Sequence, residues 1–139
     1  MPRKYALDSN LFIDGFRDIE SEGRLVDFHS RFAAVEYLSA VVALELRAGA
    51  RRDGDAHRLE RRVLRPFERR GRVFAPSYVT WVEAGGALAQ FGEATRAFYN
   101  DVLLAASCRE HGITLVTRNV RDFGRIGDVL PFDFVDAWP

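Results

Sequence analysis

The chain is poor in residue types on which several classes of protein depend. Its single cysteine, Cys108, excludes an intrachain disulfide and a cysteine-rich zinc site. No apolar run approaches the roughly 20 residues that a membrane span needs. The N-terminal residues also lack the pattern of a signal peptide. We therefore expect a cytoplasmic protein that does not enter a membrane.

Two further absences narrow the possible chemistry. Lys4 is the only lysine, so the late lysine that a phosphoacceptor receiver domain needs is missing. There is no nucleophile-elbow motif, and His29, His57 and His111 have no obvious partner serine. We expect these histidines to be packing or surface residues. Cys108 lies among apolar neighbours, so we expect it in the core.

Length and composition indicate one globular domain. The 139 residues, 47% of them hydrophobic, suffice for a single domain over residues 1–139 with a real core. The net charge is zero, but between Arg47 and Arg72 ten arginines and only four acidic residues leave a charge of +6. Two interpretations of this segment remain open, namely a solvated arginine-rich helix and a basic arm that contacts a polyanion.

Short apolar segments alternate with helical patterns along the chain. We expect strands at 4–7, 33–38, 72–75, 113–116 and near 132–135. Helices are expected after a cap at Ser9 or Asn10, over 22–32, from Ser39 to Gly49, across the arginine-rich stretch, after Pro76-Ser77, over 101–110 and after 117–119. This alternation predicts an α/β fold whose short, mostly parallel sheet of four to five strands is covered on both faces. In such sheets a ligand site lies beyond the carboxyl ends of the strands.

Three acidic residues interrupt apolar segments. Asp8 follows the first strand, Glu45 lies in the helix over 39–49, and Asp101 precedes Val102–Ala106. A buried carboxylate costs several kcal/mol unless it is paired or binds a metal. Acids far apart in sequence that converge in space therefore suggest a divalent-cation site. Purely structural roles remain open: a helix cap for Asp8, a surface position for Glu45, and a helix-dipole contact for Asp101.

A fourth site residue is expected in the loop after the 113–116 strand or just beyond it. Asn119 can cap the next helix, with Asp122 completing a variant of the capping box. Either residue can instead reach the metal pocket, directly or through a water. Both therefore remain candidates.

Four short motifs in this order resemble the PIN domain and, within it, the VapC ribonuclease toxins of toxin–antitoxin modules. They are Leu7-Asp8-Ser9-Asn10-Leu11-Phe12-Ile13, Ser39 with Glu45-Leu46, Asp101 with Leu104-Ala105-Ala106, and Thr117-Arg118-Asn119 with Asp122-Phe123. The resemblance spans nearly the whole chain. It implies a PIN-like three-layer α/β/α sandwich with Asp8 and Asp101 as the core magnesium ligands and Glu45 as the third acid. Many relatives carry an aspartate where Asn119 stands, so Asp122, or a water held by Asn119, would take that place here.

The resemblance also implies an activity and partners. We expect an endoribonuclease that uses Mg²⁺, with Mn²⁺ able to substitute, and that forms a homodimer. A small antitoxin would place its tail in the acidic groove. The arginines expected to contact RNA are Arg118 and Arg121 beside the site, together with Arg58, Arg61, Arg62 and Arg65. The alternatives are a housekeeping RNA-processing nuclease of the same fold and a PIN-like binding module without catalysis.

Overall fold

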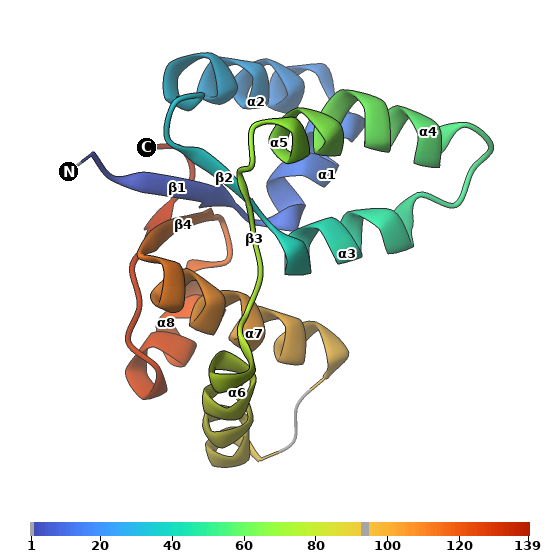
Figure 1. The fold of residues 1–139 in the computed structure, drawn as a ribbon. Coiled ribbons are helices and arrows are strands. Elements are labelled where there is room, and N and C mark those ends of the chain that lie inside the picture. The colour runs from blue at the N-terminus through green and yellow to red at the C-terminus, as the bar shows by residue number, and fades with distance from the viewer. Residues whose placement is uncertain (1, 93–94) are drawn as a thin grey trace.

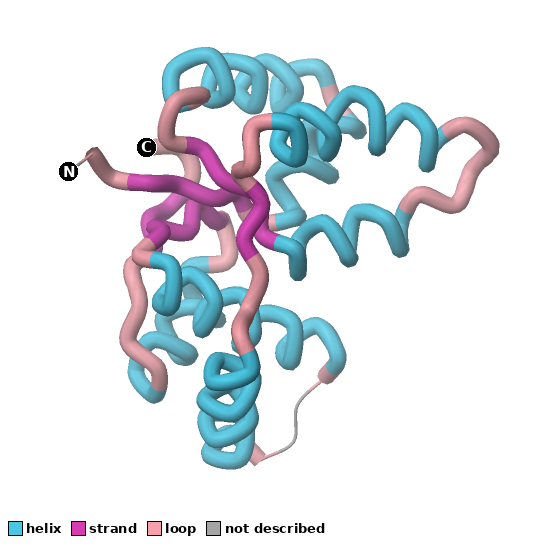
Figure 2. Tube along the Cα trace, in the orientation of Figure 1, coloured by secondary structure: helices cyan, strands magenta, loops and turns pink. Residues whose placement is uncertain are grey.

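The computed structural model describes residues 2–92 and 95–139. In these residues a sheet of five parallel strands lies between two layers of helices, which confirms the expected α/β sandwich (Figures 1 and 2). The strands are β1 (Lys4–Leu7), β2 (Glu36–Ser39), β3 (Val73–Phe74), β4 (Ile113–Thr117) and β5 (Phe134–Asp136). The helices are α1 (Ser9–Arg17), α2 (Ile19–Phe32), α3 (Ala40–Gly49), α4 (Asp55–Leu59), the π-helical turn η1 (Glu60–Leu64), α5 (Arg65–Arg69), α6 (Tyr78–Phe91), α7 (Arg96–His111) and α8 (Val120–Val129).

The order of the strands places a topological switch at the centre of the sheet. The strands lie in the order β3-β2-β1-β4-β5, and every neighbouring pair is parallel. The chain first builds outward from β1 to β3 and then crosses to the other side of β1, where Leu7 pairs with Val116 of β4. Ligand sites of open α/β sheets lie beyond the carboxyl ends of the strands at such a switch. Here that position is the end of β1 and β4.

The helices form one layer on each face of the sheet. Helices α1 and α2 and the segment from α4 to α5 cover one face, while α6, α7 and α8 cover the other (Figure 1). Helix α3 continues from the end of β2 and contacts both α1 and α7, so it joins the two layers beside the carboxyl ends of the strands. Across residues 2–92 and 95–139, none of the helices is both long enough and apolar enough to span a membrane.

The two central strands form the middle of the core. Ala6, Leu7, Leu115 and Val116 are almost completely buried, as a parallel sheet covered on both faces requires of its strands. Cys108 of α7 is also fully buried, and burial raises the pKa of its thiol, so its expected place in the core is confirmed.

Several expected ends of elements were wrong by a few residues, and two of these differences have a clear local cause. The second strand begins at Glu36 instead of residue 33, because the backbone N–H of Val35 donates to the carbonyl of Phe32 at 2.9 Å and closes a turn. Helix α7 begins at Arg96 instead of Asp101, because the Thr95 side chain accepts a hydrogen bond from the backbone of Phe98 at 3.2 Å. Asp101 therefore lies in the second turn of its helix, where a helix-dipole contact does not explain it.

The cap of α1 also differs from the expected residue. Asp8, and not Ser9 or Asn10, is the N-cap, because the strand ends at Leu7 and the helix begins at once. At the other end of the molecule, Gly112 ends α7 in the left-handed conformation, with φ of 64°, as its place after the helical pattern predicted.

A close contact between a histidine and a buried glutamate links α2 to the sheet. Glu36, at the start of β2, is 3% exposed, and its Oε1 lies 2.6 Å from Nδ1 of His29 on α2. Oε2 of Glu36 has no hydrogen-bond partner among the described residues. His29 is thus a packing residue, as expected, with a definite electrostatic partner.

We expect the variant His29→Leu to lose about 2 kcal/mol of unfolding free energy, because it leaves the Glu36 carboxyl buried without a partner. Urea denaturation at neutral pH measures the loss. The double variant His29→Leu/Glu36→Leu is the control, and it should recover most of the stability because no buried charge remains. Equal urea midpoints for wild type and the single variant would contradict the role of the pair.

Candidate active site

Asp8 is a buried and oriented carboxylate at the junction of β1 and α1. It is 3% exposed. Its Oδ1 accepts a hydrogen bond from the backbone N–H of Ser9 at 2.8 Å, and its Oδ2 accepts one from the hydroxyl of Thr117 at 2.8 Å. Burial raises the pKa of Asp8, and the hydrogen bonds from Thr117 and Ser9 oppose this by less. Asp8 therefore caps α1, as one alternative expected, and also lies at the switch point.

Glu45 lies on α3 and is half-buried, so it is not an ordinary surface glutamate. Ser39 caps this helix by accepting from the backbone of Val41 at 3.1 Å, as expected, which sets the direction in which α3 leaves the sheet. Burial raises the pKa of Glu45, and the negative charge of Asp8 raises it further. Hydrogen bonding from Asn100 and Ser9 lowers it by less. The carboxyl groups of Glu45 and Asp8 are thus close enough for the charge of Asp8 to disfavour ionisation of Glu45.

Asp101 brings the third segment to the same place. It is half-buried on α7. Its pKa is raised to about 7. The largest cause is burial, and the negative charges of Asp8, Glu45 and Asp122 raise the pKa further. Acids from the β1–α1 junction, α3 and α8 therefore all lie close enough to Asp101 to disfavour its charged form.

Asn119 and Asp122 form a single hydrogen-bonded unit. Nδ2 of Asn119 donates to Oδ2 of Asp122 at 3.2 Å, and the backbone N–H of Asn119 donates to the Thr117 hydroxyl at 3.0 Å. Asn119 is the N-cap residue of α8, as one alternative expected, but its side chain makes no capping hydrogen bond, so the capping box with Asp122 does not form. Of the two residues, Asp122 acts electrostatically on Asp101, while Asn119 holds the Asp122 carboxylate.

The oxygen-rich cluster fits a hard divalent cation that keeps part of its water shell. Among the described residues, no three Asp, Glu, His or Cys side chains lie close enough to enclose an ion by themselves. Mg²⁺ does not need such a cage, because it usually binds one or two carboxylates and retains several waters. A cation would also stabilise the buried carboxylate forms of Asp8, Glu45 and Asp101, and would offset the repulsion that adds to burial in raising the pKa values of Glu45 and Asp101. Asp8, Glu45 and Asp101 are the candidate ligands, one or two of which would bind such an ion together with its waters.

Three polar residues of the site were not among the predicted catalytic residues. Thr117 is fully buried and its hydroxyl joins Asp8 to Asn119. A polar residue at the end of an apolar strand was the available signal for it. Ser9 follows Asp8 directly, whereas Asn100 meets Glu45 only because α7 packs against α3. No pattern in the sequence indicates that last contact.

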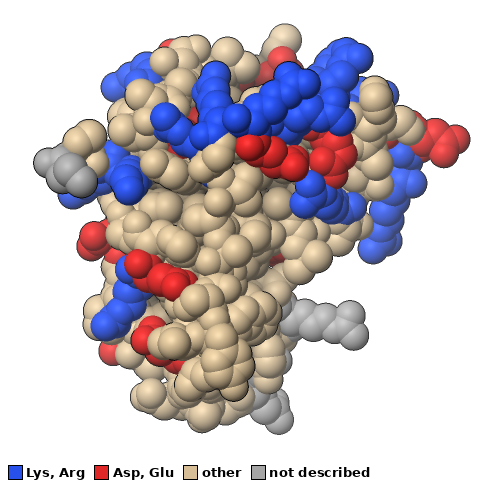
Figure 3. Space-filling model, in the orientation of Figure 1, with Lys and Arg blue, Asp and Glu red and all other residues tan. Residues whose placement is uncertain are grey.

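The predicted RNA-binding arginines fall into two groups. Arg118 and Arg121 are exposed in the segment from β4 into α8, and Nη1 of Arg118 lies 3.6 Å from Oδ2 of Asp14. The second group, which we name the basic ridge, is also exposed and runs over α4, η1 and α5 in the layer opposite α7 and α8 (Figure 3). It consists of Arg58, Arg61, Arg62 and Arg65. The structure therefore does not gather all six arginines around the acids.

Two of the four acidic residues of the basic segment, Glu60 and Glu68, are directed toward α3. Arg47 of α3 binds Glu60 through two hydrogen bonds, of 2.6 and 3.1 Å, and lies 3.7 Å from Glu68. Asp55 pairs with Arg58. Because Glu60 and Glu68 are occupied by Arg47, most of the positive charge of the ridge is left to face the solvent.

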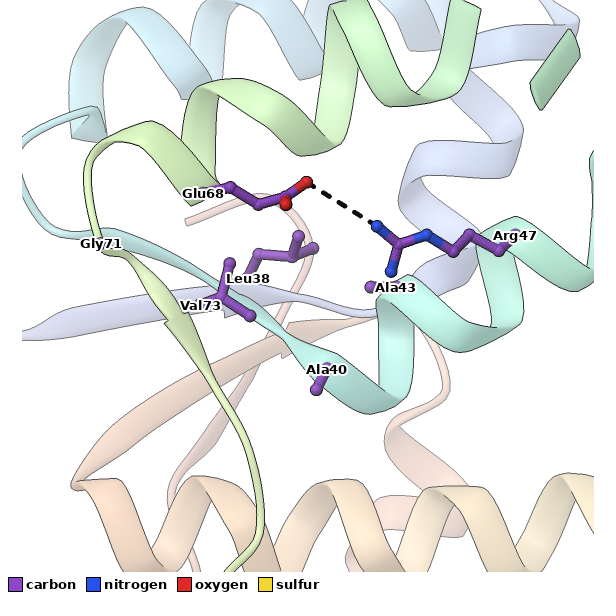
Figure 4. A pocket seen from close by; sticks show the side chains of 7 residues that line it. All are labelled: Leu38, Ala40, Ala43, Arg47, Glu68, Gly71 and Val73. Carbon is purple, nitrogen blue, oxygen red and sulfur yellow. Dashed lines mark ion pairs between the residues drawn. The ribbon is translucent and has the colours of Figure 1, made fainter. Parts of the chain in front are cut away.

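A hollow of about 360 Å³ lies between α3, α5 and the β3 edge, but it contains none of the predicted site residues. Its floor is apolar, and Arg47 and Glu68 reach toward each other across it (Figure 4). An internal ion pair already occupies its polar groups, so it offers no free group for chemistry. The acidic cluster remains the candidate site.

The raised pKa of Asp101 leads to a prediction for stability. Its folded pKa of about 7 lies above its ordinary value of 3.8, so the folded state binds a proton more tightly. This group therefore lowers stability as pH rises from about 4 to about 7. With EDTA present, we expect Asp101→Asn to unfold at a higher urea concentration than wild type at pH 8. The difference should disappear near pH 4.

The exposed loop residue Asp53 provides a matched control, and Asp53→Asn should follow wild type at both pH values. A lower urea midpoint for Asp101→Asn at pH 8 would instead make Asp101 a structural residue of the scaffold.

Comparisons with known proteins place this geometry in a family. No curated protein matches the chain closely enough in sequence to count as a relative. Among solved structures, FitAB bound to an IR36 DNA fragment is similar with a TM-score of 0.71, at 21% identity over 97% of this chain and 96% of the other. DNA-bound VapBC from Salmonella typhimurium has a TM-score of 0.70, at 19% identity over 97% and 98%. FitAcB from Neisseria gonorrhoeae has 0.68, at 23% identity over 94% and 95%.

These likenesses agree with the observed fold, in which the acids meet at the switch point between β1 and β4. The sequence model of the PIN domain matches residues 5–129, which is most of the chain and includes all four motifs that carried the resemblance. The chain therefore belongs to the PIN domain family.

Proposed function

We propose that this chain is a magnesium-dependent endoribonuclease that cleaves phosphodiester bonds of RNA in the cytoplasm. We also propose that residues 1–139 form one nuclease domain. One observation carries the proposal: the carboxylates of three other segments act on Asp101 at the switch point, and their charges add to its burial in raising its pKa to about 7. Like charges brought together at a ligand-binding edge are expected of a site built for a cation.

Each acid has a distinct role in this proposal. Asp8 and Asp101 hold the Mg²⁺, for which Mn²⁺ can substitute, and Glu45 acts as a further ligand or orients the attacking water. Asp122, held by Asn119, completes the negative environment. A bound divalent cation supplies polarisation of the phosphate, a lower pKa for a neighbouring water and stabilisation of the leaving oxygen. Thr117 keeps the Asp8 carboxylate in place for this task.

The arginines contribute electrostatic binding of the RNA strand. Arg118 and Arg121 lie at the start of the segment that carries Asn119 and Asp122, so they can contact phosphates that flank the site. The basic ridge adds a second, outward-facing positive surface. Of the two interpretations left open for the arginine-rich segment, the exposed basic ridge favours an arm that contacts a polyanion over a helix that is only solvated.

We further propose that the chain is the toxin of a VapBC-type module and that a small antitoxin binds it. The structures of VapBC and FitAB, to which the fold is similar, support this partner. The proposal includes a homodimer. Helix α6 offers a surface for that contact, since Tyr78, Val79, Trp81 and Val82 are exposed apolar residues and Glu83 is its only charged residue.

We expect the variants Asp8→Asn and Asp101→Asn each to lower RNA cleavage at least about a hundredfold, because the cation supplies most of the chemistry. Mapping of cuts in total RNA with Mg²⁺ present measures the loss and also identifies the target. Asp53→Asn provides the control for an acid away from the site and should keep full activity.

Thermal melts distinguish loss of the metal from loss of the fold. A ligand that binds only the folded state stabilises it, so Mg²⁺ should raise the melting temperature of wild type but not of the two variants. Undiminished cleavage by purified Asp101→Asn would contradict the assignment. A Mg²⁺ response without cleavage of any RNA would make the chain a binding module.

The basic ridge gives an independent prediction. Each phosphate contact with single-stranded RNA contributes about −0.7 to the slope of log affinity against log salt. Replacing Arg61, Arg62 and Arg65 by glutamine should therefore make the slope less steep by about 2, as measured by fluorescence anisotropy. The matched control replaces three exposed arginines elsewhere, Arg3, Arg24 and Arg31. If the two triple variants gave equal slopes, the arginines of the basic ridge would not contact RNA and would be ordinary solvated surface residues.

A further inference from the structure

Arg125 on α8 has a setting unlike those of the arginines already described. Its Nη1 lies 3.9 Å from Oδ1 of Asp122, one helical turn earlier. Its guanidinium carbon lies 5.4 Å from the ring centre of Phe98 and 5.7 Å from that of Phe91. Arg125 thus lies near both a site acid and two aromatic rings.

The two rings form a fixed support for this arginine. Phe91 ends α6 and Phe98 lies in the first turn of α7, and their centres are 5.0 Å apart at an interplanar angle of 63°. A guanidinium over an aromatic ring gains about 0.5–1 kcal/mol at exposed sites. The side chain is therefore held in one region before any ligand arrives, and it loses less freedom on binding than an unsupported arginine.

The guanidinium remains available for another acceptor. At 3.9 Å its contact with Asp122 is an ion pair beyond hydrogen-bonding range. The side chain is also 57% exposed. A planar guanidinium has five donors and binds a phosphate through two parallel hydrogen bonds. Its exposed face can also stack on a base of a single strand.

The position of Arg125 connects it with the acidic site. The negative charge of Asp122, its ion-pair partner, acts on Asp101. Phe98 lies three residues before Asp101, on the same side of α7. A cation at this edge can neutralise a phosphate of the strand that the acids alone would repel.

We propose that Arg125, supported by Phe91 and Phe98, binds a phosphate of the RNA strand adjacent to the one that is cleaved. The inference rests on the proposed nuclease function and adds a substrate subsite to it. The ligand is a phosphodiester of single-stranded RNA, and the residue acts in binding and not in the chemical step.

The test compares Arg125→Gln with Arg31→Gln. Arg31 is a matched control because it is also exposed and its guanidinium carbon lies 5.2 Å from the ring centre of Phe32, near the amino ends of the strands. We expect Arg125→Gln to raise KM for a short single-stranded RNA about tenfold with little change in kcat, because a charge-assisted contact is lost. Arg125→Lys should fall between Arg125→Gln and wild type, since it keeps the charge without the planar fork.

A binding measurement separates this inference from the proposed function. The same three substitutions are combined with Asp101→Asn, and RNA affinity is followed against salt by fluorescence anisotropy. Arg125→Gln should make the slope less steep by about 0.7, whereas Arg31→Gln should leave it unchanged. A structural role for Arg125 would lower the melting temperature without moving this slope. Equal KM and slope for Arg125→Gln and Arg31→Gln would overturn the inference alone, while cleavage that survives Asp101→Asn would overturn the proposed function.

Discussion

The parallel pairing of β1 with β4 is the constraint on which the rest of the structure depends. It sets Leu7 against Val116, and the backbone N–H of Asp8 then donates to the carbonyl of Val116 at 2.9 Å. This register places the Thr117 hydroxyl beside the Asp8 carboxylate, where the two groups bond. The same hydroxyl accepts the backbone N–H of Asn119, so the pairing of two strands also fixes the segment that leads into α8 and Asp122. A shift in register would separate all of these groups.

This arrangement costs electrostatic free energy, because it holds ionisable carboxyl groups in buried positions close to one another. Burial raises the pKa values of Asp8, Glu45 and Asp101, neighbouring negative charges raise those of Glu45 and Asp101 further, and hydrogen bonds from Thr117, Ser9 and Asn100 offset only part of the effect. A scaffold selected for stability alone would place apolar residues at these positions. The buried pair of Glu36 and His29 differs, because there a buried carboxylate has its own internal partner. The uncompensated burial and repulsion of these acids at one end of the sheet therefore support the proposal that this end carries the function.

The zero net charge of the chain conceals a separation of charge over its surface. The basic ridge covers the α4–α5 side, because Arg47 holds Glu60 and Glu68 toward α3. The acids of the candidate site lie near Asp101, between the two helical layers. Arg125 lies beside them, over the rings of Phe91 and Phe98. Helix α6 is nearly free of charge and exposes apolar side chains. Three surfaces of different chemistry thus lie on one small fold, each suited to a different kind of contact.

The sequence by itself determined the order of strands and helices, the helix end at Gly112, and the placement of Asp8 and Thr117 at strand ends, because these depend on local periodicity and conformation. It also singled out Asp8, Glu45 and Asp101 as acids in apolar surroundings. Glu36 satisfies the same description, yet it pairs with His29 and lies at the amino end of its strand. The hydrogen bond of Thr117 with Asp8, the hydrogen bond of Asn119 with Asp122, and the contact of Asn100 with Glu45 were decided only by the three-dimensional structure. The physical reason is that the role of a buried charge depends on its neighbours in space, and those are supplied by packing between segments distant in sequence.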